Sequence, residues 1–231
     1  MTGDVPSYHR VGYAGGMTTP IGETGSKPAP GRLALVQAFI NTLDLETERD
    51  ALATPDGLGA WLGSHGLLAP GAAVSQDERE RAVAVREALR RLLLVNAGLL
   101  AVDETRTDRA VLADTSARCP LIVHLDDDGA THLEPAVAGI DGALAVLLAA
   151  VHDARLVGAW SRLKACRNDR CHWAFYDHSK NRSGTWCTMA VCGSRLKSRA
   201  YRERQAVGDA RSRRGSLRGL DTDVPREDDR A

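Results

Sequence analysis

Apolar side chains recur at helical spacing through the middle of the chain. Leu33, Val36, Ile40 and Leu43 follow one another at intervals of three, four and three, which predicts one buried face of a helix. Asn41 is a polar exception on this largely apolar segment. We expect its amide to bond to backbone groups, because buried polar atoms in proteins are almost always hydrogen-bonded.

Start and stop signals define two further helices. Thr54 and Pro55 suit the cap and the first turn of a short helix that Gly66 ends. The longest helix should run from a cap at Ser75 to Gly98, because a three-four alternation of apolar residues follows an acidic first turn.

Two short strands and a last helix follow. The segment CPLIVHLDDDGATHLEPA resembles a hairpin joined at Asp128-Gly129, a strong turn dipeptide. The aspartates at 126–128 lack the ligand spacing of an EF-hand loop, so we expect a solvated turn there. A final helix should extend from about Ile140 to Leu163. The predicted fold is therefore mainly α, a helical N-terminal domain with a small β-hairpin.

The two ends of the chain lack this periodicity. Residues 1–30 hold six glycines and four prolines, and residues 207–231 mix arginines with acids around few large aliphatic side chains. Such segments bury too little apolar surface to fold. We expect a disordered leader over 1–30, a helical domain over 31–159, a small module over 160–206 and a disordered tail over 207–231.

Charge is unevenly placed although the formal net charge of the chain is zero. Residues 31–159 carry 19 acidic and 11 basic side chains, a net of −8, whereas residues 160–204 carry 3 acidic and 11 basic ones, a net of +8. An asymmetry of this kind indicates that the basic segment meets a polyanion.

Four of the five cysteines fall within the same basic segment. Cys166 and Cys171 are separated by four residues, as are Cys187 and Cys192, with fifteen residues between the pairs. Two close pairs at this separation are typical of a tetrahedral four-thiolate zinc site. Disulfides are the alternative, but the N-terminus lacks a secretory signal and a reducing cytoplasm keeps thiols free. We expect one structural zinc per chain, bound by these four residues.

Other sequence features argue against an enzyme and against a membrane protein. Nucleophile-elbow, phosphate-loop and zinc-protease motifs are absent, and a closed four-thiolate site leaves no position for a catalytic water. No apolar run reaches the roughly 18 residues of a membrane span. The expectation is a cytoplasmic protein that is not an enzyme.

The basic segment resembles the CGNR zinc finger. The resemblance rests on the cysteine pairs, the F-Y-D-x-S-x-N-R core at residues 175–182, the W-C-T-M-A-V-C-G run and the trailing basic helix; Ser194 replaces the motif's asparagine. Segments such as AFINTLDLE and REALRRLLL are similar to the ABATE domain, which precedes this finger in bacterial proteins described as stress-induced transcription regulators. The resemblance implies a treble-clef-like finger and a role in DNA binding.

In such a finger the last helix would present its cations on a rigid surface that suits DNA phosphates. Met189, Leu196 and Ala200 would face the finger's core, as would most of its aromatic side chains. The candidate nucleic-acid contacts are Arg182, Arg195, Lys197, Arg199, Arg202 and Arg204.

Two functions stay open at this stage. In the first, the protein is a zinc-dependent DNA-binding transcription regulator whose acidic helical domain senses a signal or dimerises. In the second, it is an adaptor whose basic finger docks an acidic partner, which the −8 and +8 segments also favour. Homodimerisation and binding of a small-molecule effector are left open by the sequence.

Overall fold

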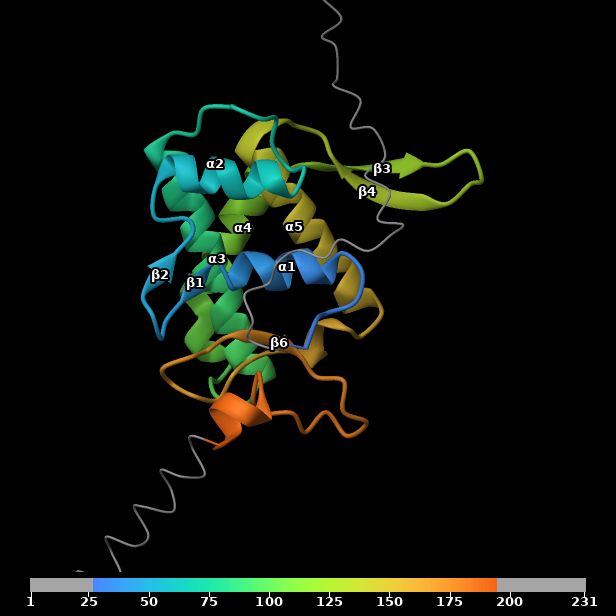
Figure 1. Cartoon of the computed structure of the whole chain (residues 1–231). Coiled ribbons are helices and arrows are strands. Elements are labelled where there is room, and N and C mark those ends of the chain that lie inside the picture. The colour runs from blue at the N-terminus through green and yellow to red at the C-terminus, as the bar shows by residue number, and fades with distance from the viewer. Residues whose placement is uncertain (1–26, 195–231) are drawn as a thin grey trace, which may run out of the picture. The chain divides into compact units, whose positions relative to one another are not determined.

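The computed structural model describes residues 27–194 (Figure 1). They fall into a first unit that ends at Thr188 and a second that begins at Met189. Most of the predicted leader, the tail over 207–231 and the basic helix beyond Ser194 lie outside the described residues.

The first unit is mainly helical, and three small antiparallel hairpins accompany its helices. Its α-helices are α1 (Leu33–Ile40), α2 (Pro55–Ser64), α3 (Gln76–Asn96), α4 (Arg106–Arg118) and α5 (Gly139–Leu156). Its strand pairs are β1 (Leu43–Asp44) with β2 (Arg49–Asp50), β3 (Leu121–Leu125) with β4 (Thr131–Pro135), and β5 (Leu163–Ala165) with β6 (Ala174–Tyr176). The predicted fold class is confirmed.

The helix starts follow the capping signals of the sequence. The Thr54 side chain accepts a hydrogen bond from the backbone N–H of Gly57 at the start of α2. At the start of α3, Ser75 and Glu78 form a reciprocal capping box. Each cap satisfies backbone donors that the first helical turn leaves unpaired.

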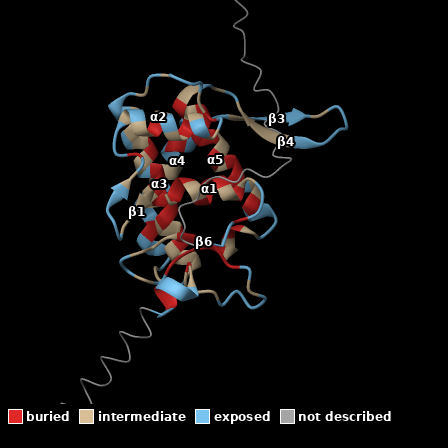
Figure 2. Ribbon diagram, viewed as in Figure 1, coloured by how far each residue is buried: buried red, intermediate tan, exposed pale blue. Residues whose placement is uncertain are grey.

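The core lies where α1, α3 and α5 meet, and the buried residues concentrate on their facing sides (Figure 2). Phe39 of α1, Leu89 of α3 and Leu147 of α5 are fully buried there. Leu163 and Ala174 of the β5–β6 hairpin belong to the same core cluster. The hairpin that precedes the second cysteine pair is therefore packed into the helical core.

Two predicted helix ends were wrong. α5 stops at Leu156 instead of reaching Leu163, because Gly158 adopts a left-handed φ of 69° and Leu163 pairs with Tyr176 in a sheet. α1 likewise stops at Ile40, and Leu43 lies in β1. In both places the apolar spacing continues past the helix because the strand that follows also carries buried or partly buried apolar side chains.

The sequence pattern missed α4. This helix carries no fully buried large side chain; Val111 and Leu112 pack against the core only in part, and Thr115 is its one buried residue. An apolar stripe this weak gives little periodic signal.

The predicted hairpin over residues 119–136 is confirmed. β3 and β4 pair in register from Leu121 opposite Pro135 to Leu125 opposite Thr131, and Gly129 supplies the left-handed φ of 81° that its turn requires. The hairpin extends away from the helices (Figure 1), and its tip is exposed.

Candidate metal centre and basic finger

The first half of the predicted finger is held by buried backbone pairing. β5 and β6 pair antiparallel, with Leu163 opposite Tyr176 and Ala165 opposite Ala174, and all six of their residues are buried. This fixes the position at which Cys166 leaves the sheet.

Two side-chain amides fasten this hairpin to the helices: Gln37 belongs to α1, and Asn41 directly follows its last residue. Asn41 brackets Ala174: its Nδ2 donates to the Ala174 carbonyl at 2.9 Å, and its Oδ1 accepts the Ala174 N–H at 2.7 Å. Gln37 Nε2 donates to the same carbonyl at 3.1 Å. The expectation that Asn41 bonds to backbone is confirmed.

Replacing Asn41 by aspartate should destabilise this attachment. The carboxylate can still accept the Ala174 N–H, but its second oxygen would face the Ala174 carbonyl, so a donor is replaced by a repelling acceptor. We expect a loss of about 1–3 kcal/mol in the free energy of unfolding, measured by urea denaturation. An Asn41→Asp variant as stable as the wild type would contradict the role of the donor.

The first cysteine pair flanks a tight turn between β5 and β6. The backbone N–H of Cys166 donates to the Trp173 carbonyl at 2.9 Å, and that of Cys171 donates to the Asn168 carbonyl at 2.8 Å. His172 takes a left-handed φ of 44° directly after the second cysteine. The turn thereby carries Cys171 back toward the start of the loop.

The second cysteine pair lies where an irregular segment is followed by a helical turn. Cys187 is buried at the end of an irregular segment. In the second unit, Cys192 lies within the helical turn Met189–Gly193, which Ser194 braces by donating its Oγ hydrogen to the Met189 carbonyl. The prediction that Met189 faces the finger's core was wrong, since this side chain is 52% exposed. Leu196 and Ala200 lie outside the described residues.

The four thiols gather in one cluster. The sulfur atoms of Cys166, Cys171, Cys187 and Cys192 all lie within 4.8 Å of one another, and those of Cys171 and Cys187 are 3.7 Å apart. Four sulfurs placed tetrahedrally at about 2.3 Å from a zinc ion are about 3.8 Å apart, whereas a disulfide needs about 2.05 Å. The donor set and its spacing therefore fit a zinc-finger metal site.

The proximity of the thiols also changes their acidity. Hydrogen bonds from Cys171 and Cys187 lower the pKa of the Cys166 thiol, and hydrogen bonds with Cys166 and Cys187 raise the pKa of Cys171. The cluster thus favours a thiolate at Cys166, the form in which cysteine binds metals. Cys119, in contrast, is buried in the helical core, and desolvation raises its pKa to about 11.

One buried carboxylate organises the loop between the pairs. Asp177 is fully buried and accepts hydrogen bonds from Lys164 Nζ at 2.8 Å, the Gly184 N–H at 2.8 Å and the Ser179 N–H at 3.0 Å. A Cβ on Gly184 would lie 2.6 Å from the carboxylate. The backbone N–H groups of Ser179 and Gly184 therefore wrap the loop around the Asp177 carboxylate, and position 184 has no room for a side chain.

The cations of the finger divide into two groups. Lys164 is buried against Asp177, and Arg162 donates to the carbonyls of Asp177 and Ser179, so these two hold the fold. The other described cations of the segment are exposed: Arg167, Arg170, Lys180 and Arg182.

The structure describes only one of the candidate nucleic-acid contacts. Arg182 is exposed at a left-handed φ of 52°, with its guanidinium 3.3 Å from the Ser161 hydroxyl. The remaining candidates lie outside the described residues: Arg195, Lys197, Arg199, Arg202 and Arg204.

The aromatic side chains serve the core more than the surface. Phe175 is fully buried and Tyr176 nearly so, as expected for core residues. Trp173 and Trp186 are partly exposed. The polar contacts that shape the loop, centred on Asp177, were not singled out from the sequence, although the F-Y-D-x-S-x-N-R pattern contains them.

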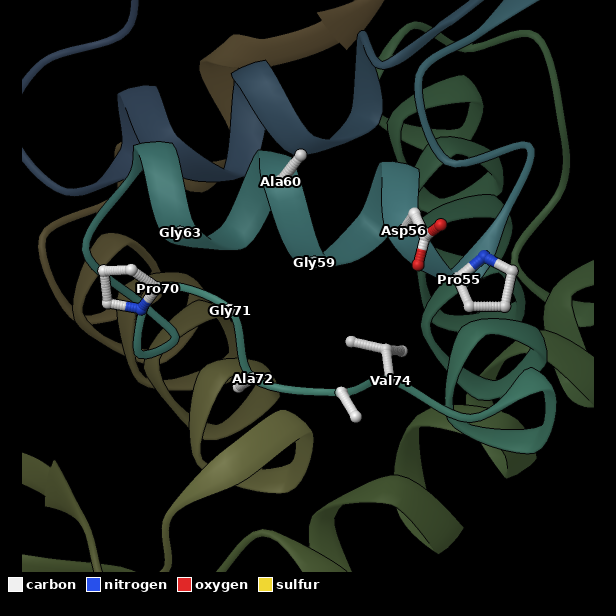
Figure 3. A pocket seen from close by; sticks show the side chains of 10 residues that line it. Pro55, Asp56, Gly59, Ala60, Gly63, Pro70, Gly71, Ala72 and Val74 are labelled. Carbon is white, nitrogen blue, oxygen red and sulfur yellow. The ribbon is translucent and has the colours of Figure 1, made fainter.

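A separate open hollow of about 690 Å³ lies between α2 and residues 70–74 (Figure 3). Its lining is mostly glycine, alanine and proline, and Asp56 is the only ionisable side chain among the described residues that form it. This carboxylate has no nucleophile or second acid beside it in the lining, so the hollow lacks a catalytic constellation.

Fold and site together define a helical protein with a four-cysteine cluster of the zinc-finger type. Residues 162–205 match the family model described as CGNR zinc finger. Residues 33–159 match the ABATE model, described as "Putative stress-induced transcription regulator". The chain belongs to this family, with an ABATE domain followed by a CGNR zinc finger, as the sequence motifs predicted. The family's description is that of a regulator, not of an enzyme.

A search of curated proteins found no match. Across the described helices, none combines the length and apolarity that crossing a membrane requires.

Proposed function

We propose that this protein is a transcription regulator that binds DNA through its zinc-loaded finger. Cys166, Cys171, Cys187 and Cys192 would hold one zinc ion, which supplies a structural cross-link and no reaction. We assign residues 160–206 to DNA binding and residues 31–159 to sensing or dimerisation, with 1–30 and 207–231 as flanking segments.

The observation that carries the proposal is the net charge of +8 over residues 160–204, beside a clustered four-thiol site. Arg162 and Lys164 are used in the fold. The exposed Arg167, Arg170 and Lys180 remain free to meet phosphates. A protein that neutralises phosphates with such side chains releases counterions, so its affinity falls as salt rises.

Removing two candidate contacts should flatten this salt dependence. For Arg199→Ala with Arg202→Ala, the slope of log affinity against log salt should fall by about two units at most. Fluorescence anisotropy of the full chain on a labelled duplex, at several salt concentrations, gives this slope. Arg106→Ala with Arg109→Ala, which removes two exposed cations of α4, is the matched control and should leave the slope unchanged.

The opposite charges of the two segments also support an adaptor whose finger docks an acidic partner. If the zinc-containing wild type binds no duplex at low salt, the DNA proposal fails and the adaptor replaces it. If the wild type binds but the double variant keeps its slope, the phosphate contacts lie elsewhere in the finger.

A further inference from the structure

A second group of metal-ligating side chains occupies the β3–β4 hairpin, apart from the cysteines. His124 of β3 lies directly opposite His132 of β4. Glu134 stands two residues along β4 from His132, and side chains two apart share one face of a strand. Two imidazoles and a carboxylate therefore lie on one face of this hairpin.

The distances bring these groups together. The ring centroids of His124 and His132 are 5.0 Å apart, and His132 Nε2 lies 3.0 Å from Glu134 Oε1. The candidate ligand atoms of His124, His132 and Glu134 all lie within 4.8 Å of one another. Asp126, just past the end of β3, approaches both rings, with its two oxygens 3.8 and 3.7 Å from the Nδ1 atoms of His124 and His132.

This spacing is close to what a bound ion needs. Imidazole and carboxylate ligands lie about 2.0–2.2 Å from zinc, so they are at most about 4.4 Å apart. A small rotation of these partly exposed side chains would close the difference. The paired strands already fix the backbone, so little chain ordering would oppose binding.

We propose that this hairpin face is a second metal site, for a divalent transition ion such as Zn²⁺ or Co²⁺. His124, His132 and Glu134 are its ligands, and Asp126 lies outside this group, near the Nδ1 atoms of both rings. Mixed nitrogen and oxygen donors suit ions of this class better than Mg²⁺ or Ca²⁺, which prefer oxygen alone. Because the site is exposed, its ion exchanges with solvent, in contrast to the ion of a buried four-thiol site.

Co²⁺ distinguishes the two sites by its spectrum. Added to the zinc-loaded full chain, Co²⁺ should give weak visible d–d bands without a sulfur charge-transfer band, because the hairpin offers only nitrogen and oxygen. His124→Ala should weaken Co²⁺ binding at least about tenfold, since even the loss of a ligand's supporting partner costs 10–100-fold in metal affinity. Glu134→Gln should weaken it less, because one carboxylate is replaced while both imidazoles stay.

His152→Ala is the matched control, since this histidine is exposed on α5, and it should bind Co²⁺ like the wild type. A thermal melt followed by circular dichroism checks that the variants are folded. Binding that is equally strong in His124→Ala, binding with a sulfur charge-transfer band, or a wild-type Kd above about 1 mM would each overturn the proposal. None of these outcomes bears on DNA binding by the finger.

Discussion

A Cys171→Ser variant should contain no stoichiometric zinc and should lose DNA binding, while it keeps most of its helical signal. A four-thiolate site binds its ion with roughly 10–16 kcal/mol of apparent free energy, and serine replaces a thiolate with a hydroxyl that is far less acidic. The Cys171 sulfur lies 3.7 Å from that of Cys187, so its loss removes one of the four clustered donors.

The loss of structure in Cys171→Ser should be confined to part of the finger. Leu163, Ala165 and Ala174 pack in the core of the helices, and Asn41, directly after α1, donates to the Ala174 carbonyl. We therefore expect the β5–β6 hairpin to survive and the segment around the second cysteine pair to lose its structure. Metal analysis, circular dichroism and anisotropy on a duplex measure zinc, helix and DNA affinity in turn.

Cys119→Ala provides the matched control. This thiol is buried in the helical core, outside the cluster, so the variant should keep its zinc and its DNA affinity at a small cost in stability. Full zinc in Cys171→Ser, or full DNA affinity without zinc, would contradict the proposed role of the cluster.

The position of the β5–β6 hairpin explains how so small a finger is stable. A module of about 45 residues rarely builds a sufficient core of its own. Here Leu163 and Ala174 belong to the core of α1 and α3, and the cysteines cluster in the part beyond that core. An excised finger would expose these core residues, so experiments on the full chain are the sounder ones.

The sequence predicted the helix starts and the hairpin turn, because neighbouring residues determine them. Thr54 and Ser75 start their helices by accepting backbone N–H groups three residues ahead, and Asp128-Gly129 turns the hairpin with a glycine at positive φ. The cysteine cluster was also predictable, because the two paired spacings leave few other arrangements. The caps, the turn and each of the two cysteine pairs depend on residues close together in the chain.

Features that depend on distant residues could not be predicted in this way. Arg86 is almost fully buried in α3 and donates to both oxygens of Asp50, 36 residues earlier. Arg90 donates to the carbonyl of Ile40 at the end of α1. From the sequence alone such arginines look like the solvated face of an amphipathic helix. Their burial becomes clear only when the partner segments are placed beside them.

Inside the finger, Asp177 is likewise a buried charged residue whose partner lies elsewhere in the chain. Its removal should have a large effect on stability. In Asp177→Ala, the buried ammonium of Lys164 would lose its carboxylate, and the N–H groups of Gly184 and Ser179 would lose their acceptor. Breaking a buried ion pair by removing one partner costs roughly 3–5 kcal/mol. Adding Lys164→Met to the variant should recover part of this loss, because no charge is then left unpaired.

The same carboxylate makes a prediction about pH. Burial opposes ionisation of Asp177, but hydrogen bonds from Lys164, Ser179 and Gly184 outweigh it and hold its pKa well below the usual range. A depressed pKa contributes stability that is fully present above the unfolded value of about 3.9 and is lost as the pH falls through the folded value. The difference in unfolding free energy between wild type and Asp177→Ala should therefore be constant near neutral pH and shrink below about pH 4. Urea denaturation across this range measures this difference. Asp153→Ala is the control: this acid is partly exposed and lies 3.6 Å from Arg32, so its loss should cost at most about 1 kcal/mol. A difference that stays constant down to pH 2 would mean that packing, and not the charge of Asp177, holds the loop.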